Sequence, residues 1–218
     1  MGVPSPKTCA ARLWGDPEVQ QTILRALHNP FVRALGAGDL PREAFQSYIA
    51  EDAFFLRSFA EGYGAAIQRC GPQQQHLAQA LRELLVGVQE ELKLHDSYAA
   101  EWGVDLSQHQ QPLPATKAYV DWLHAVASDP QQGVAGIVSA MVPCLRLYAY
   151  LALQLGKAFP EAEHEYTEWV RSYSSPEYLR LPGKAEAVLD ETAASESFGE
   201  RGWGVCRCCW QQSGDEKA

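Results

Sequence analysis

Asp52 places a carboxylate in an otherwise apolar helical pattern. The residues three and four positions away from it are apolar or aromatic: Tyr48, Ile49, Phe55 and Leu56. Because these spacings fall on one face of a helix, Asp52 shares the face that we expect to be buried. An unpaired carboxylate there would cost several kcal/mol. The pattern therefore predicts a partner for Asp52, which is either a group on a neighbouring helix or a ligand.

Cys144 is the second residue with chemical potential. It lies on the apolar face of another helical stretch, directly after Pro143 and one turn before Tyr148. A buried cysteine is most often an inert packing residue, and a nucleophile needs a lowered thiol pKa or an adjacent base. A proline inside a helix removes one backbone donor and opens the turn beside it, which suits a pocket wall. Both interpretations of Cys144 stay open on spacing alone.

Tyrosine is unusually frequent on the inward faces of the predicted helices. A buried phenol needs a hydrogen-bond partner, so a purely hydrophobic core would favour phenylalanine instead. The pattern predicts a polar cavity lined by aromatic rings, which suits a flat heteroaromatic ligand bonded to Asp52. The alternative is that many hydroxyls reach the surface at helix ends. The inward tyrosines are Tyr48, Tyr63, Tyr98, Tyr119, Tyr148, Tyr166 and Tyr173.

The elements that must position these residues are helices almost throughout. Asp16-Pro17-Glu18 is a typical helix start, and Asn29-Pro30 interrupts the helix that follows. No stretch shows the alternating pattern of a strand, so the predicted fold is an all-α bundle, with ligand sites between facing helices. This first segment ends at Gly36–Asp39. The other predicted helices are one that begins at Pro41, Gln73–Trp102, one that ends near Ser128, Val134–Phe159, Glu161–Tyr173 and a weaker helical segment, Lys184–Glu191.

Composition narrows the function classes. The chain has 218 residues and a net charge of −9, from 18 Lys and Arg against 27 Asp and Glu. This balance disfavours a nucleic-acid partner, because binding to the phosphate backbone depends on clustered basic residues. No apolar run reaches the roughly 20 residues of a membrane span. Residues 1–16 lack the apolar h-region of a secretory signal. The six cysteines do not form the dense disulfide framework of a small secreted protein. We therefore predict a cytoplasmic protein without nucleic-acid or membrane partners.

The sequence does not predict a metal site or a cofactor. Glu91 and His95 are four apart, but the second such pair that a di-iron bundle needs does not occur. The terminal Cys206-Arg207-Cys208-Cys209 lacks the spacing of common zinc sites, and we interpret it as a tail without function. His95, three residues after Leu92, is interpreted as a hydrogen-bonded core histidine.

Five segments together resemble the TenA/thiaminase II family, which has the haem-oxygenase-like helical fold. They occur in family order, and their most specific element is Pro143-Cys144-x-x-Leu147-Tyr148. This element is typical of the branch with cysteine, rather than glutamate, at that position. The details look most like the TenA domain of plant and algal thiamin phosphate phosphatases. The segments are Phe45–Leu56, Leu94–Tyr98, Ala115–Tyr119, Val142–Tyr148 and Trp169–Ser175.

The resemblance implies a hydrolase of thiamin salvage, an aminopyrimidine aminohydrolase or thiaminase II. Such enzymes convert 4-amino-5-aminomethyl-2-methylpyrimidine to the hydroxymethylpyrimidine and ammonia, and some cleave thiamin itself. By resemblance, Cys144 is the nucleophile that adds to the ring, and Asp52 binds the ring nitrogen and amino group. The resemblance also implies no cofactor and a homo-oligomer, tetrameric in the family. The remaining implied substrate-binding residues are Tyr48, Phe55, Tyr119, Tyr148 and Tyr173.

The chain departs from the family pattern near its C-terminus. We expect a TenA-like domain over residues 13–191 and an atypical, disordered tail over 192–218, so that a normal last helix is lacking. The family places an acid–base glutamate on that helix, and Glu196 and Glu200 are not in its context. One alternative is therefore a catalytically impaired protein that binds pyrimidines or thiamin fragments. Another is a cofactor-binding bundle of the PqqC or haem-oxygenase type, for which His28 is the only candidate axial ligand.

Overall fold

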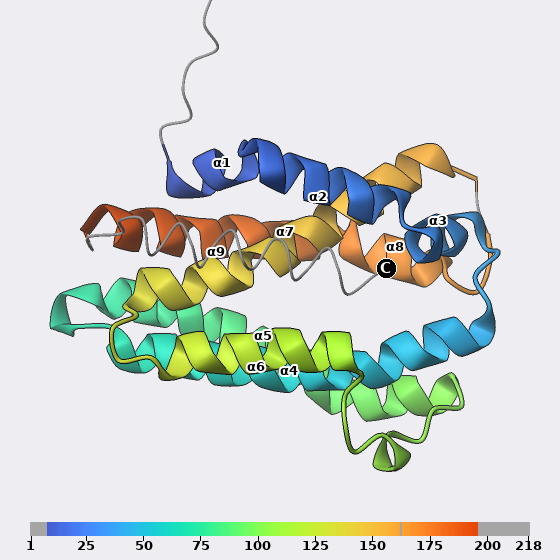
Figure 1. The fold of residues 1–218 in the computed structure, drawn as a ribbon, viewed down its shortest axis with the longest axis horizontal. Helices are drawn as coiled ribbons and strands as arrows, with labels where there is room; N and C mark the ends of the chain where they lie inside the picture. Colours follow the sequence, from blue (N-terminus) through green and yellow to red (C-terminus); the bar gives the residue numbers. More distant parts are fainter. Residues whose placement is uncertain (1–7, 162, 196–218) are drawn as a thin grey trace, which may run out of the picture.

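The computed structural model describes residues 8–161 and 163–195 of the chain, and across these residues all regular structure is helical (Figure 1). The all-α prediction is therefore confirmed for the described residues. The connector before α6 contains a short 3₁₀ turn at Leu106–Gln108, and another, Pro72–Gln74, precedes α5. The α-helices are α1 (Cys9–Trp14), α2 (Pro17–His28), α3 (Pro30–Ala37), α4 (Arg42–Arg69), α5 (Gln75–Glu101), α6 (Pro114–Ser128), α7 (Val134–Ala158), α8 (Thr167–Tyr173) and α9 (Pro176–Ser195).

Two side-chain caps set the boundaries near the N-terminus, as the sequence predicts. The Asp16 carboxylate accepts a hydrogen bond from the Glu18 N–H at 2.9 Å and so starts α2. The Asn29 side chain accepts from the Phe31 N–H at 2.8 Å, which starts α3 after Pro30 breaks the preceding helix. At the end of α3, Gly38 adopts φ 85°, a left-handed conformation that favours glycine.

Long helices form the body of the bundle. Figure 1 shows α4, α5, α6, α7 and α9 running roughly along the long axis of the molecule. Helix α7 packs against α4, α6, α8 and α9 and is the central core helix. It is also the one helix among the described residues that is long and apolar enough to cross a membrane, but 72% of its apolar window is buried inside the bundle. Burial on this scale is typical of the core helix of a folded domain.

Two helices differ from their predicted extents. Helix α8 starts at Thr167 rather than at Glu161, because His164 folds the preceding chain into a turn. The His164 N–H donates to Thr167 Oγ1 at 2.9 Å, and its Nδ1 accepts from the Tyr166 N–H at 3.1 Å. The predicted weak segment Lys184–Glu191 is part of a 20-residue helix, α9, which contains Pro182.

Helix α9 is held to the bundle by specific polar contacts. The Ala10 N–H of α1 donates to Asp190 Oδ1 at 2.8 Å. Arg146 of α7 forms an ion pair with Glu186, and its guanidinium lies 4.2 Å from the ring centroid of Trp14. Thr192 is fully buried, so α9 stays part of the fold beyond the boundary predicted at residue 191. The rest of the predicted tail, with Glu196, Glu200 and the three terminal cysteines, lies outside the described residues.

Candidate functional site

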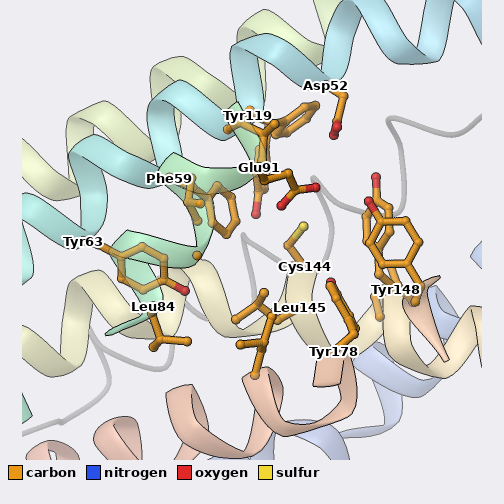
Figure 2. A pocket seen from close by; sticks show the side chains of 17 residues that line it. Asp52, Phe59, Tyr63, Leu84, Glu91, Tyr119, Cys144, Leu145, Tyr148 and Tyr178 are labelled. Atoms are coloured by element: carbon orange, nitrogen blue, oxygen red, sulfur yellow. The ribbon is translucent and has the colours of Figure 1, made fainter. Parts of the chain in front are cut away.

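A cavity of about 150 Å³ lies between the long helices, and Cys144 is in its wall. We call it the thiol pocket. Figure 2 shows the Cys144 thiol pointing into a space surrounded by aromatic rings and two carboxylates. The residues that line the thiol pocket are Asp52, Phe55, Leu56, Phe59, Tyr63, Leu84, Gly87, Val88, Glu91, Tyr119, Cys144, Leu145, Leu147, Tyr148, Tyr173, Tyr178 and Leu181.

The structure brings together the residues that the sequence singled out. Helix α4 supplies two of them, α6 one, α7 two and α8 one, although they are far apart in the chain. The seventh, Tyr48, borders two adjoining cavities, both of which Asp52 also borders. The six that line the thiol pocket are Asp52, Phe55, Tyr119, Cys144, Tyr148 and Tyr173.

Asp52 is held beside a buried histidine. The Nε2 of His95 lies 3.0 Å from the Ile49 carbonyl oxygen, which can only accept, so this nitrogen carries the proton. The other ring nitrogen, Nδ1, then faces Asp52 Oδ2 at 4.0 Å. The interpretation of His95 as a hydrogen-bonded core residue is confirmed, since its side chain is 6% exposed. Its position also fixes which nitrogen faces the Asp52 carboxylate.

Cys144 is a half-buried cysteine on α7, at the turn that contains Pro143. Its electrostatic influence reaches Tyr63 and Tyr178, which places both phenols near the sulfur. Tyr119 and Phe55 form another wall of the pocket, with ring centroids 5.2 Å apart. The thiol therefore faces a space of ring-like dimensions, bounded by aromatic side chains rather than by a histidine base.

Tyrosines form an aromatic cluster beside the thiol. The Trp169 Nε1–H donates to the Tyr48 hydroxyl at 3.2 Å, and the rings of Tyr148 and Tyr173, whose hydroxyls influence Tyr48, lie with centroids 4.9 Å apart. Burial raises the pKa of Tyr48 well above its ordinary value, and the nearby Asp52 charge raises it further. Burial likewise raises the pKa of Tyr148 and of Tyr173. These phenols therefore stay neutral at physiological pH and act as hydrogen-bonding groups rather than as tyrosinate bases.

Glu91 and Tyr178 are among the residues of the thiol pocket that were not predicted as site residues. Glu91 comes from α5, and Figure 2 shows its carboxylate pointing into the same space as the Cys144 thiol. Desolvation in the pocket wall and, to a smaller extent, the neighbouring Asp52 raise the pKa of Glu91 to about 7, although the residue is exposed where the pocket opens. Tyr178 comes from the first turn of α9 and packs edge-on against Tyr173, with centroids 4.7 Å apart. The signal for Glu91 was available, because it lies three residues after Val88 on the apolar stripe.

An outer cleft of about 880 Å³ adjoins the thiol pocket. Asp52, Glu91, Tyr173 and Tyr178 border both spaces, so they stand where the two meet. The cleft is rich in carboxylates, and its arginine, Arg171, is paired with Glu163 at 2.5 Å. Such a mouth attracts cationic groups more than anions. The carboxylates that line it are Asp52, Glu90, Glu91, Glu168 and Glu177.

Metal and haem chemistry find little support in the described part of the chain. No group of three or more His, Cys, Asp and Glu side chains in residues 8–161 and 163–195 could hold a metal ion. His28, the candidate axial ligand, is exposed at the end of α2, and its Nδ1 donates to the Leu24 carbonyl oxygen at 2.8 Å. It borders neither the thiol pocket nor the outer cleft.

Comparison with known sequences gives matches that cover most of the chain. Residues 16–197 match the TENA/THI-4/PQQC family. The Bifunctional TH2 protein, mitochondrial, of Arabidopsis thaliana is 29% identical over 88% of this chain, which spans only 33% of that protein. The Aminopyrimidine aminohydrolase of Halalkalibacterium halodurans is 28% identical over 84% of this chain and 83% of its own length. The chain thus spans a third of the plant relative and most of the bacterial one.

Comparison with solved structures gives the fold. A TenA homologue protein from P. horikoshii OT3 superposes with a TM-score of 0.77, at 23% sequence identity, over 96% of this chain and 94% of the other. The described residues therefore adopt the haem-oxygenase-like helical bundle of TenA homologues, as the sequence predicts.

Proposed function

Because the chain belongs to the TENA/THI-4/PQQC family, we propose that it is a hydrolase that releases the group attached to the exocyclic methylene of an aminopyrimidine. The proposed reaction converts 4-amino-5-aminomethyl-2-methylpyrimidine to hydroxymethylpyrimidine and ammonia, a step of thiamin salvage. Bacterial relatives named Aminopyrimidine aminohydrolase support this assignment. The observation that carries it is that a thiol and a carboxylate, from Cys144 and Asp52, line one aromatic cavity.

The thiol pocket fits one pyrimidine ring. A cavity of about 150 Å³ is comparable to the size of engineered cavities, roughly 150 Å³, that hold a benzene molecule in other proteins. Phe55, Tyr119 and Tyr148 offer ring faces and edges for stacking. In the proposed complex, Asp52 binds a ring nitrogen and the amino group, which have the donor and acceptor pattern that a carboxyl group complements. Tyr173 completes the polar wall, and Tyr48 borders the adjoining cavities next to Asp52.

Covalent addition activates the ring in the proposed mechanism. A neutral aminopyrimidine is a poor electrophile until an acidic group protonates or hydrogen-bonds its ring nitrogen, which is the role assigned to Asp52. The thiol S–H then adds across a ring C=N bond, so that Sγ bonds to carbon and the proton ends on nitrogen. This addition interrupts the aromaticity and lets the electrons of the ring expel the methylene substituent. Since the tyrosines stay neutral, the thiol proton passes to the ring nitrogen through the Asp52 carboxyl group that is bonded to it.

Ammonia release tests the proposal. The purified chain is incubated with the aminomethylpyrimidine, and ammonia and hydroxymethylpyrimidine are quantified. Wild type should produce both in equal amounts, and Cys144→Ser should abolish turnover while it still binds the pyrimidine in calorimetry. Full activity of Cys144→Ser would overturn the nucleophile assignment. Measurable ligand binding by wild type without turnover would instead favour the impaired pyrimidine-binding protein.

We also propose a cytoplasmic location and a homo-oligomer, tetrameric as the family resemblance implies. The plant relative is named as mitochondrial, so cell fractionation with an antibody to this chain decides the location. Exposed apolar side chains on the described surface include Leu24, Val86 and Leu113, which are 48–53% exposed. Light scattering of the purified protein gives the oligomeric state, and a monomer at all concentrations would exclude the tetramer.

A further inference from the structure

Departure of the amine places a chemical demand on the site. When the C–N bond of the aminomethylpyrimidine breaks, the nitrogen takes the bonding electron pair and must leave as ammonia rather than as an amide anion. The amine and the groups around it therefore have to supply one proton. Thiamin makes no such demand, because its thiazolium nitrogen takes the electron pair and leaves as a neutral thiazole. The two substrates thus distinguish a site that supplies a proton from one that only binds the ring.

Two carboxyl groups line the thiol pocket among the described residues, those of Asp52 and Glu91. Asp52 lies on α4 beside His95, and the proposed function assigns it to the pyrimidine ring. Glu91 lies on α5, at the boundary between the thiol pocket and the outer cleft. This boundary is a route by which a group leaving the ring bound next to Cys144 can reach solvent.

From this placement, and resting on the proposed function, we propose that Glu91 is a further catalytic residue, the acid that protonates the departing amine. Figure 2 shows the Glu91 carboxylate pointing toward the pocket interior, beside the space that the Cys144 thiol faces. Glu91 lies on α5, within the described residues. The described residues therefore contain an acid for the leaving group without the C-terminal glutamate of the family.

The surroundings of Glu91 suit an acid at physiological pH. Glu91 is exposed where the thiol pocket opens into the outer cleft. Desolvation by the surrounding wall, with a smaller contribution from the Asp52 charge, raises its pKa to about 7, while His95 opposes this shift. Part of the Glu91 population then carries a proton at pH 7, which is the condition for an efficient general acid. The titratable and charged groups that line the two spaces with it are Tyr48, Asp52, Tyr63, Glu90, His95, Tyr98, Tyr119, Cys144, Tyr148, Glu168, Arg171, Tyr173, Glu177 and Tyr178.

The proton balance of the step closes on named groups. The Glu91 carboxyl proton bonds to the amine nitrogen as the C–N bond breaks, so ammonia and a Glu91 carboxylate form. A water oxygen then bonds to the methylene carbon and gives its proton to that carboxylate. The ring nitrogen returns its proton to sulfur as the C–S bond breaks. The sum is one water consumed, one ammonia released and an unchanged enzyme.

Leaving-group dependence tests the role of Glu91. The kcat/KM values of wild type and Glu91→Gln are measured with the aminomethylpyrimidine and with thiamin, because kcat/KM covers all steps up to departure of the leaving group. Glu91→Gln should lower kcat/KM for the amine by about 100-fold, the usual contribution of a general acid. The value for thiamin should stay close to that of wild type. The matched control is Glu101→Gln, a change at the last residue of α5, outside the thiol pocket and the outer cleft.

The pH profile gives a second readout that a merely structural role would not change. In wild type, kcat for the amine should fall as the pH rises through about 7, since the acid form of Glu91 is lost; the Glu91→Gln profile should lack this fall. Parallel losses with both substrates, or no loss with either, would overturn the acid role while leaving the proposed function in place. A wild type that turns over neither substrate would instead overturn the proposed function, and the role of Glu91 with it.

Discussion

Replacing Tyr63 by phenylalanine should make the free protein more stable. The Tyr63 side chain is 1% exposed, and its buried hydroxyl has no hydrogen-bond partner among the described residues. A buried polar group without a partner loses its hydration and costs about 1–3 kcal/mol. Tyr63→Phe removes this group and keeps the ring, which packs edge-on against Phe59 with centroids 6.4 Å apart.

The expected gain in the free energy of unfolding is about 1 kcal/mol, at the lower end of that range, because the hydroxyl borders the thiol pocket and water there can hydrate it in part. For a domain of this size the corresponding rise in Tm is about 2–4 °C. Urea denaturation followed by tryptophan fluorescence measures the free energy, and an unchanged m value shows that the two proteins unfold comparably.

Tyr166→Phe is the matched control. Tyr166 is also 1% exposed, but its hydroxyl donates to the Leu40 carbonyl oxygen at 2.6 Å, away from the thiol pocket. Removing this bond should lower the free energy of unfolding by about 1 kcal/mol. The two substitutions delete the same atom and should act with opposite sign. If Tyr63→Phe destabilises the protein as much as Tyr166→Phe, its hydroxyl has a partner and the reasoning is refuted.

Two further predictions concern the carboxyl groups. Asp52→Asn should weaken hydroxymethylpyrimidine binding by about 10- to 100-fold in calorimetry, the loss expected for a hydrogen bond to a charged group; unchanged affinity would remove Asp52 from the site. Glu91 should make the protein less stable as the pH rises from about 4.5 to 7, because its raised pKa means that the folded state binds its proton more tightly than the unfolded state does. Thermal unfolding across this window should show a flatter profile for Glu91→Gln, and identical profiles would contradict the assigned pKa.

Sequence reasoning located much of the site because helical spacing reports burial well. Asp52 stands out because every neighbour on its face is apolar or aromatic, and the structure places it in the wall of the thiol pocket. Glu91 has a similar apolar neighbour, since Val88 precedes it by three residues, but it is exposed where the thiol pocket meets the outer cleft. Helical spacing, which reports burial, therefore identifies Glu91 less clearly than Asp52.

Tyr178 could not be found in this way. Pro176, Pro182 and Gly183 are residue types that disfavour a helix interior, and the predicted helix begins only at Lys184. In the structure Pro176 occupies the first position of the helix, where its missing N–H is not needed, and the helix continues through Pro182 to Ser195. Packing against α7, α5 and α1 stabilises α9. Such tertiary contacts override local propensity, and no local pattern reports them.

The contact between α1 and α9 brings the first and last described helices of the domain together. Ala10, in the first described helix, is bonded to Asp190, near the end of the last one. Figure 1 shows the start of α1 and the end of α9 at the same end of the bundle. The fold can therefore be inserted into a longer polypeptide, because both connecting segments leave from one end of the bundle and the core does not need to rearrange. It should also tolerate circular permutation, with a short linker joining these helices and new termini in the exposed connector before α6.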